Sequence, residues 1–481
     1  MGARSGTNYL SSLRRLKAEV WIGGERVADV TTHPAFLHCG RSIASLYDMQ
    51  AEQPAVMTYR TDDGDRIGYS FVQPAAADEV RKRSIMMKRW ADFSGGMLGR
   101  TPDYLNSSLA AMASAAAFFA ESEPRFGANV VNYYKQARKF DWCATHTLVN
   151  PRASRAAGWA GETDQDLALR VVRKTPDGIL VSGARLLATL APLCEELLVF
   201  PSTVLKNDRH AEPFALAFAI PCNTAGLKFL CRETFDLGRS HFDHPLASRF
   251  EEMDAVVIFS DVLVPWDRVF LCEDVARCNA LYGETDAIVN MMHQVVVKDL
   301  AKAEFLLGLA ARIAQASDAM GLQHVQERLA EMIMTTETMR ACLRASEAEA
   351  APNRWGVFMP ARAPLDTARN LFPRLYPRMV EIIQLNSSSA LMAIPSEADF
   401  DSTLGPDIER YYAAAQANSR DRVALYRLAW DVASSSFGGR QVLYERFFFG
   451  DPVRMASALV ANTDLKPYID RINEFLGRSH S

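Results

Sequence analysis

The pattern of apolar and polar positions divides the chain into three stretches. Up to about residue 140, apolar residues recur at the spacing of amphipathic helices, as in "RFGANVVNYYKQARKF". From about Asp141, short apolar runs alternate with turn residues, and "LALRVVRKTPDGILVSG" predicts a β-hairpin around Pro176-Asp177-Gly178. From about Glu284 long helical periodicity returns. We therefore predict a mostly α, α+β multidomain protein: an N-terminal helical domain (residues 1–140), a central β-barrel or β-sandwich domain (141–276) and a C-terminal four-helix-bundle domain (277–481).

One predicted helix, "AIVNMMHQVVVKDLAKAEFLLGLAARIAQAS", has polar residues on an otherwise apolar background. Asn290, Gln294, Lys298 and Lys302 recur every four residues, so they form a stripe along one face.

A helix start is predicted in "GRTPDYLNSSL", residues 99–109. Thr101 suits the N-cap, and Pro102 at the first helical position loses no hydrogen bond. Arg100 then lies just outside the helix and Tyr104 in its first turn, both near the positive end of the helix dipole. An ordinary capped helix with a surface arginine and a packed tyrosine would give the same pattern.

Composition excludes several classes of function. With 49% hydrophobic and 23% charged residues, the 481-residue chain has an ordinary globular composition. A net charge of −4 gives no nucleic-acid footprint. The eight scattered cysteines form no CxxC pair, and no apolar run is long enough to span a bilayer, so we expect a cytoplasmic protein without a membrane segment. His241 and His244 fall in a predicted loop, and no metal site is expected.

Common nucleotide and hydrolase motifs are absent from the sequence. There is no GxGxxG after a strand, no GxxxxGK[ST], no HExxH and no GxSxG. Redox chemistry would therefore need a cofactor that binds without these fingerprints, which leaves the flavins.

Seven segments, in consistent order from about Tyr9 to the end, resemble one enzyme family. They are "GRTPDYLN", "ATHTLVNPRASR", "ARLLATLAPLCEELLVF", "FALAFAIPCNTAGLKFLCRE", "SRFEEMDAVVIFSDVLVPWDRVFL", "MMHQVVVKDLAKAEFLLGLA" and "FGGRQVLYERFFFGDP". The chain resembles the oxygenase component of 4-hydroxyphenylacetate 3-monooxygenase, a family of two-component flavin monooxygenases with an acyl-CoA dehydrogenase-like fold.

The resemblance implies an activity and its partners. A separate NAD(P)H-dependent reductase supplies reduced FAD, and the oxygenase forms a C4a-hydroperoxyflavin with O2 and hydroxylates a phenol ortho to its hydroxyl. The leading substrate is 4-hydroxyphenylacetate, which gives 3,4-dihydroxyphenylacetate. A homotetramer, or dimer of dimers, is implied as well.

The resemblance also assigns the phenol site. Arg100, Tyr104 and His146 match the positions expected near the phenol oxygen, where a base and charge stabilisation favour a phenolate. They are the expected catalytic and substrate-binding residues, although His146 alone would also fit a core histidine. In the loop 202–214, Ser202 and Thr203 are expected to bind the substrate tail, with Lys206, Arg209 or His210 as possible ion-pair partners. A solvated charged turn is the alternative interpretation of that loop.

The expected flavin contacts are spread over the chain. Thr189 is expected near the flavin N5, and Arg100, His146 and Thr147 near the ring. The adenosine and pyrophosphate half is expected on the C-terminal domain, partly from a neighbouring subunit, through Gln384, Asn386, Ser387, Arg440 and Gln441. The "NSSS" run at 386–389 is more polar than the glycine and alanine usual in relatives.

Three alternatives stay open. In the first, the same chemistry acts on a chlorophenol, a hydroxycinnamate, or a free or carrier-tethered tyrosine derivative in a biosynthetic pathway. In the second, the chain is an acyl-CoA dehydrogenase-like or dehydratase-like enzyme. In the third, it is a non-catalytic flavin carrier. The dehydratase would need three cysteines beside His293 as cluster ligands, and the matching segments contain none.

Overall fold

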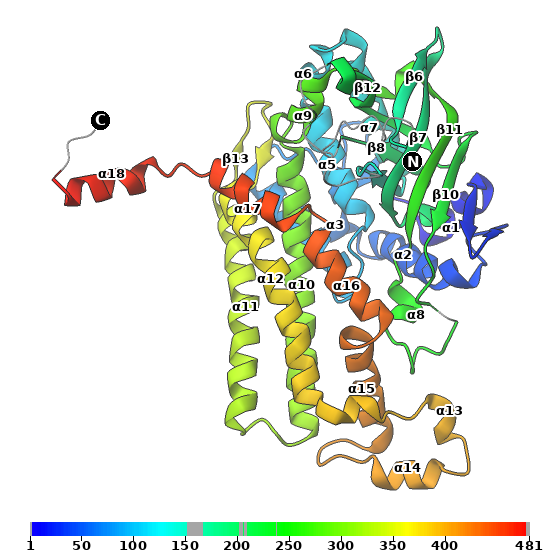
Figure 1. The fold of residues 1–481 in the computed structure, drawn as a ribbon, viewed down its shortest axis with the longest axis vertical. Coiled ribbons are helices and arrows are strands. Elements are labelled where there is room, and N and C mark those ends of the chain that lie inside the picture. Colours follow the sequence, from blue (N-terminus) through cyan, green and yellow to red (C-terminus); the bar gives the residue numbers. More distant parts are fainter. Residues whose placement is uncertain (1, 152–166, 202–204, 206–208, 237, 478–481) are drawn as a thin grey trace.

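The computed structural model describes residues 2–151, 167–201, 205, 209–236 and 238–477. Within these ranges no helix combines the length and the apolar character needed to cross a membrane. The three predicted regions follow one another as helices, sheets and helices (Figure 1).

The N-terminal region is mainly helical, as predicted. Its helices are α1 (Gly6–Leu16), α2 (Pro34–Glu52), α3 (Pro54–Met57), α4 (Ala77–Phe93), α5 (Pro102–Ser114), α6 (Ala116–Ala120) and α7 (Pro124–Phe140). It also contains the strand pairs β1 (Val20–Ile22) with β2 (Glu25–Arg26) and β3 (Thr58–Arg60) with β4 (Arg66–Gly68), which we did not predict. Strands of two or three residues are too short to show a period-two pattern.

The central region consists of two sheets. The strands are β5 (Ala144–Thr147), β6 (Arg170–Lys174), β7 (Gly178–Thr189), β8 (Glu196–Val199), β9 (Leu216–Pro221), β10 (Leu227–Cys231), β11 (Asp254–Pro265) and β12 (Val269–Cys272). One sheet has the order β2-β1-β10-β11-β7-β6 and the other β12-β9-β8-β5. The predicted hairpin is the antiparallel pair β6–β7. One isolated bridge, between Val149 and Leu186, links the two sheets at an edge, but no closed barrel forms within the described residues. The region is therefore a sandwich, and the barrel alternative was wrong.

The N-terminal region contributes to this sandwich, because β1 pairs in parallel with β10. The large sheet is therefore not confined to residues 141–276. The domain boundaries near residues 140 and 276 stay a prediction.

The C-terminal region is built on long helices. Its helices are α9 (Val275–Glu284), α10 (Ala287–Ala316), α11 (Gln323–Ala348), α12 (Arg362–Ser387), α13 (Glu397–Phe400), α14 (Gly405–Tyr411), α15 (Ser419–Ala433), α16 (Ser436–Phe447), α17 (Pro452–Ala461) and α18 (Lys466–Phe475). The short α8 (Ala247–Phe250) belongs to the preceding region, and β13 (Ala351–Pro352) pairs with β14 (Phe358–Met359). Helix α10 packs against α4, α5, α11 and α12, and α16 lies between the long helices and the sandwich (Figure 1).

The polar stripe of α10 is completely buried and joins three parts of the fold. Asn290 contacts Arg83 of α4, and Gln294 contacts Asp103 of α5. Lys298 donates to both carboxylate oxygens of Glu445 on α16 (2.7 and 2.8 Å), and Lys302 contacts the same carboxylate. Buried charges are tolerated where they are paired in this way. The stripe thus fixes α5 and α16 relative to α10.

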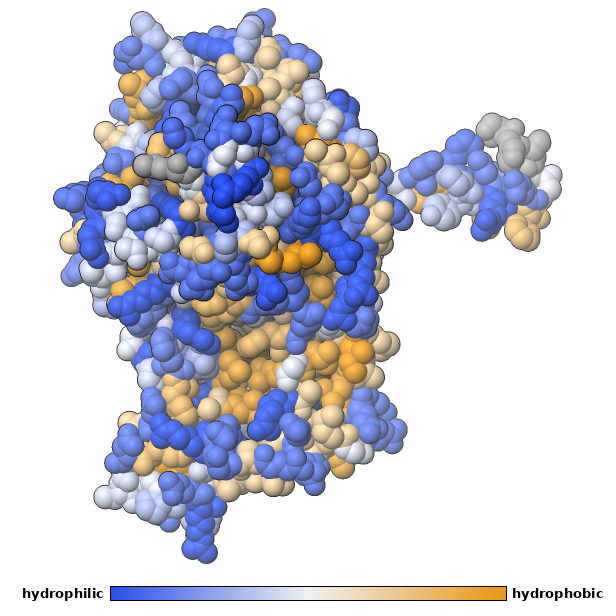
Figure 2. Space-filling model, turned by 180° about the vertical axis from the view of Figure 1, so that it is seen from behind, coloured by the Kyte–Doolittle hydropathy of each residue, from blue (hydrophilic) through white to orange (hydrophobic). Residues whose placement is uncertain are grey.

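The C-terminal helix α18 projects from the body of the molecule (Figure 1). It has no buried residue, and Tyr468, Ile469, Ile472 and Phe475 are exposed. The opposite view shows apolar side chains gathered in a hollowed band across the middle of the molecule (Figure 2).

Candidate active site

Helix α5 begins at Pro102 and places Thr101 at the N-cap position, as predicted. The Thr101 hydroxyl makes no capping hydrogen bond, however; it donates to Oδ1 of Asp103 at 2.5 Å. Arg100 is only 8% exposed and Tyr104 3%, so the alternative of a surface arginine was wrong. The helix start lies inside the molecule because the bundle and the sandwich cover it from both sides.

The guanidinium of Arg100 lies among aromatic rings. Its Cζ is 4.1 Å from the ring centroid of Tyr104 and 5.1 Å from that of Phe448. The Arg100 backbone N–H donates to Glu252 Oε1 at 2.6 Å, whereas Nη1 has no hydrogen-bond partner among the described residues. Burial alone would lower the pKa of Arg100, but Tyr104 and Tyr444 help to raise it above its usual value. The site therefore holds a permanent cation with an unpaired N–H hydrogen-bond donor.

His146 lies on β5, which pairs in parallel with β8. Its ring centroid is 5.5 Å from that of Tyr104, with an angle of 30° between the planes. Burial, and after it the charge of Arg100, lower the pKa of His146 well below its usual value. The imidazole is therefore neutral near pH 7, and one of its ring nitrogens can accept a hydrogen bond. Burial raises the pKa of Tyr104, so that phenol keeps its proton.

Four of the predicted site residues line one cavity of about 280 Å³: Arg100, Tyr104, His146 and Thr189. The hydroxyls of Tyr282 and Tyr444, which also line it, have no hydrogen-bond partner within the described ranges. The remaining wall is mostly apolar and includes Phe447–Phe449. The cavity thus combines a cation, a neutral histidine and unpaired polar groups in an aromatic enclosure.

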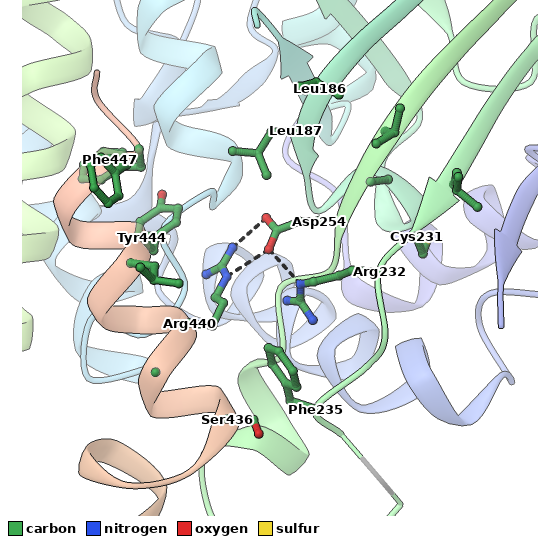
Figure 3. Close-up of a pocket in the computed structure, with 16 residues that line it drawn as sticks. Leu186, Leu187, Cys231, Arg232, Phe235, Asp254, Ser436, Arg440, Tyr444 and Phe447 are labelled. Carbon is green, nitrogen blue, oxygen red and sulfur yellow. Dashed lines mark hydrogen bonds and ion pairs between the residues drawn. The ribbon is translucent and has the colours of Figure 1, made fainter. Parts of the chain in front are cut away.

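A larger cavity of about 860 Å³ adjoins the first and shares Leu187, Tyr444, Phe447 and Phe448 with it. It lies between α16 and the strands β7, β10 and β11 (Figure 3). Arg440 of α16 reaches across it to Asp254, which Arg232 also contacts (Figure 3). Apart from these charged groups the wall is predominantly apolar, as is usual for a cofactor pocket.

Thr189 and Asp254 connect the two cavities. Thr189 lines the smaller cavity and Asp254 the larger, and the Thr189 hydroxyl donates to Asp254 Oδ1 at 2.7 Å. Burial tends to raise the pKa of Asp254, but the charges of Arg440 and Arg232 outweigh it and hold that pKa at about 2. Asp254 is therefore a carboxylate at neutral pH.

The other expected flavin residues lie elsewhere, and none of them lines either cavity except Arg440. Thr147 is buried and donates to the carbonyl of Leu186. Gln441 is buried between Lys302 and the carbonyl of Met97. The roles of Thr147 and Gln441 stay predictions.

The three expected flavin residues of α12 lie at its C-terminal end. The Gln384 amide donates to the carbonyl of Ala433, Asn386 accepts from Arg328, and Ser387 is buried. Their roles also stay predictions, because none of the three lines either cavity.

The expected substrate loop is only partly described. Ser202, Thr203 and Lys206 lie outside the described residues. Arg209 and His210 are exposed at the start of the 3-10 helix η4 (Arg209–Phe214).

Sequence reasoning missed Asp254, Arg232, Tyr282 and Tyr444 as lining residues. Tyr444 had a usable signal: it follows Arg440 by one helical turn in "FGGRQVLYERFFFGDP", and the aromatic run after it forms the cavity wall. Asp254 had no such sequence signal, because the residues that contact it in space are far away in the sequence.

Comparison with known proteins agrees with this geometry. The 4-hydroxyphenylacetate 3-hydroxylase N-terminal family matches residues 5–271, and its C-terminal family matches residues 278–477. The chain is 48% identical over 478 residues to the 4-hydroxyphenylacetate 3-monooxygenase oxygenase component of Geobacillus sp. (strain PA-9), covering 99% of this chain and 97% of the relative. It is 32% identical over 481 residues to a Streptomyces globisporus monooxygenase of a carrier-bound (3S)-3-amino-3-(3-chloro-4-hydroxyphenyl)propanoyl group, covering 97% and 89%.

A solved structure of the same kind confirms the fold. The crystal structure of the oxygenase component of 4-hydroxyphenylacetate 3-monooxygenase complexed with FAD and 4-hydroxyphenylacetate superposes with a TM-score of 0.95 at 47% identity, covering 98% of both chains. The predicted acyl-CoA dehydrogenase-like architecture is thereby confirmed. With both family matches together spanning nearly all of its length, this chain belongs to the 4-hydroxyphenylacetate 3-hydroxylase family.

Proposed function

We propose that this protein is the FAD-dependent oxygenase component of a two-component monooxygenase that hydroxylates a phenol ortho to its hydroxyl, with 4-hydroxyphenylacetate as the leading substrate. The observation that carries the proposal is the smaller cavity, which joins Arg100, Tyr104 and His146 to Thr189 beside a second, larger cavity. The 47–48% identity to oxygenase components of this activity supports it.

The larger cavity fits a flavin. Its apolar wall suits an isoalloxazine ring, Thr189 stands at its junction with the smaller cavity, and Arg440 provides a cation beside it. Reduced FAD, supplied by a separate NAD(P)H-dependent reductase, would bring the electrons that activate O2. The protein would then bind and orient the flavin and exclude water from the site.

The smaller cavity fits a phenol. The unpaired Nη1 of Arg100 can donate to the phenol oxygen and lower the pKa of the phenol, so that neutral His146, although a weak base, can accept the phenol hydrogen. Arg100 then stabilises the phenolate, which is a far better carbon nucleophile than the neutral phenol, and Tyr104 keeps a proton with which to hydrogen-bond it. The mostly apolar, aromatic wall around them makes the surroundings less polar than water, so these charges act more strongly than they would in solvent.

The flavin site includes further residues in our proposal. Gln384, Asn386, Ser387 and Gln441 would bind the adenosine and pyrophosphate half, partly in a neighbouring subunit. Phe447 and Leu443 of the larger cavity are 55% and 59% exposed, which leaves that wall available to a second copy. The exposed apolar face of α18 supports the same conclusion, and we propose a homotetramer in the cytoplasm.

The substrate tail distinguishes the possible phenols. Ser202 and Thr203 would bind a carboxylate, and a loop that leaves this end open would admit a larger phenol instead. The 32% identity to a monooxygenase of a carrier-bound substrate favours a carrier-tethered tyrosine derivative as the second candidate.

One experiment tests the proposal. The protein is mixed anaerobically with photoreduced FAD, exposed to O2 with 4-hydroxyphenylacetate, a chlorophenol, a hydroxycinnamate or a tyrosine derivative, and the catechol is measured by mass spectrometry. We expect stoichiometric catechol from at least one phenol. Flavin oxidation at the rate of free FAD, with peroxide as the sole product, would refute the proposal. Tight flavin binding with no catechol from any phenol would favour a flavin carrier.

A further inference from the structure

We propose that Asp254 is a positioning residue: it fixes the Thr189 hydroxyl as a hydrogen-bond acceptor toward the flavin and so makes the site prefer reduced over oxidised FAD. This inference rests on the function proposed above, because it assigns a redox preference to the same flavin site.

The two residues are partners in the sheet. Thr189 ends β7 and Asp254 begins β11, and they lie opposite each other in the antiparallel register. The Thr189 Oγ1 to Asp254 Oδ1 distance is 2.7 Å, and the two residues are only 7% and 9% exposed. The backbone carbonyl of Thr189 accepts from Thr145 at 2.7 Å, which holds the end of the strand in place. The hydroxyl therefore has a fixed neighbour on the side away from the smaller cavity.

The direction of this hydrogen bond is set by Asp254's other contacts. Arg440 donates to Oδ1 (2.8 Å) and Oδ2 (3.0 Å), and Arg232 donates to Oδ2 (3.0 Å), as the dashed lines in Figure 3 show. Two guanidinium groups keep the carboxyl ionised, and an ionised carboxyl can only accept. Thr189 must therefore donate to it, and a hydroxyl has one hydrogen only. The side of the Thr189 oxygen that faces the smaller cavity presents lone pairs alone, and in our proposal the flavin N5 meets it where the two cavities adjoin.

This polarity distinguishes the two redox states of a flavin. The N5 atom of reduced flavin carries a hydrogen and donates, whereas N5 of oxidised flavin has a lone pair and accepts. A threonine that only accepts thus complements N5–H and faces oxidised N5 with two lone pairs in apposition. One such hydrogen bond, gained in one state and unpaired in the other, corresponds to about a 10-fold difference in affinity. An oxygenase that takes reduced FAD from a reductase and releases oxidised FAD would benefit from this bias.

Binding measurements test the inference without relying on turnover. Dissociation constants for oxidised FAD and, anaerobically, for reduced FAD are measured by titration calorimetry for the wild type and for Asp254→Asn. The asparagine amide can donate to Thr189, which frees the Thr189 hydrogen to point into the cavity. We expect the ratio of the oxidised to the reduced dissociation constant to fall about 10-fold in Asp254→Asn.

Matched variants separate this effect from general damage to the site. Thr189→Val should lower the ratio similarly, Thr189→Ser should keep it, and Asp254→Asn should cause no further fall when combined with Thr189→Val. Glu251→Gln removes another carboxylate partner of Arg232 (2.6 Å) without touching Thr189, so it should leave the ratio unchanged.

The outcomes are distinguishable. A folded Asp254→Asn with the wild-type ratio overturns the inference. If Asp254→Asn does not fold, an unchanged ratio in Thr189→Val overturns it as well. A wild-type protein that binds FAD in neither state refutes the proposed function itself.

Discussion

Replacing His146 with alanine removes the neutral base that we place beside the phenol oxygen. A simple phenol has a pKa of about 10, so about one molecule in 10³ is ionised at pH 7 without help. Burial and Arg100 keep His146 unprotonated, so its lone pair is free to accept the phenol hydrogen at that pH. The lowered pKa also makes the imidazole a weaker base, and the Arg100 cation beside the phenol oxygen offsets this by stabilising the phenolate. We therefore expect His146→Ala to lower the rate of hydroxylation by about 10²–10³-fold at pH 7, within the usual range for a general base.

The size of this loss should depend on how readily the phenol ionises by itself. Between pH 7 and 9 the ionised fraction of the free phenol rises about 10-fold per pH unit, so the ratio of wild-type to variant rate should fall by a similar factor. An electron-poor phenol that is already ionised at pH 7 should show a loss of only a few fold. The assay is single-turnover catechol formation with pre-bound reduced FAD, with the dissociation constant of FAD measured alongside.

Two results would refute this reasoning. A loss that is the same at pH 7 and pH 9 and for both classes of phenol would show that His146 positions the substrate rather than accepting its proton. Activity within a few fold of the wild type at pH 7 would remove His146 from the mechanism. His146→Gln serves as a matched control, since it keeps hydrogen-bonding capacity but is not a base near neutral pH.

Other parts of the structure make further predictions. Arg100→Met should weaken phenol binding and divert most turnovers to free peroxide, measured as the catechol-to-peroxide ratio; an unchanged ratio would contradict its role beside the phenolate. Glu445→Gln should destabilise the fold by about 3–5 kcal/mol in urea unfolding, because buried Lys302 loses its carboxylate partner whereas Lys298 keeps Asp299 at 2.6 Å; a loss below about 1 kcal/mol would mean that Lys302 is solvated or gives up its proton in the variant. The Asp254 pKa of about 2 lies below its unfolded value of about 3.9, so this group should contribute about 2–3 kcal/mol of stability above pH 4. That contribution is lost as the pH falls toward 2, and Asp254→Asn should flatten this part of the acid-unfolding profile. Ile472→Asp on the exposed face of α18 should lower the molar mass found by light scattering, and an unaltered assembly would show that this face does not hold the subunits together.

Much of the local structure could be predicted from the sequence because local rules decide it. A threonine-proline pair marks the start of α5, and Pro176-Asp177-Gly178 marks the β6–β7 turn. The four-residue spacing of the α10 stripe likewise predicts one polar face, and α10 has it. Matching the motifs of this chain to the family it resembles predicted that four residues lie near one reaction centre. All four, Arg100, Tyr104, His146 and Thr189, line one cavity.

The tertiary structure decided whether these features face solvent or each other. The polar face of α10 would ordinarily be a solvated surface, but α5 and α16 cover it and convert it into buried ion pairs. Similarly, the local sequence pattern allows Arg100 to be a surface residue, but the structure shows a buried cation among aromatic rings. Burial of this kind depends on packing between elements hundreds of residues apart, which no local pattern records.

Asp254 shows the same limit most clearly. Its partners Thr189, Arg232 and Arg440 come from β7, from just beyond β10 and from α16, and only strand register and helix packing bring them together. The sequence by itself determined the elements, the chemistry available and the family; the tertiary structure determined the two cavities and the direction of the hydrogen bonds between them. The reason is physical: helix caps, turns and amphipathic spacing act over a few residues, whereas burial and hydrogen-bond direction are set by long-range contacts.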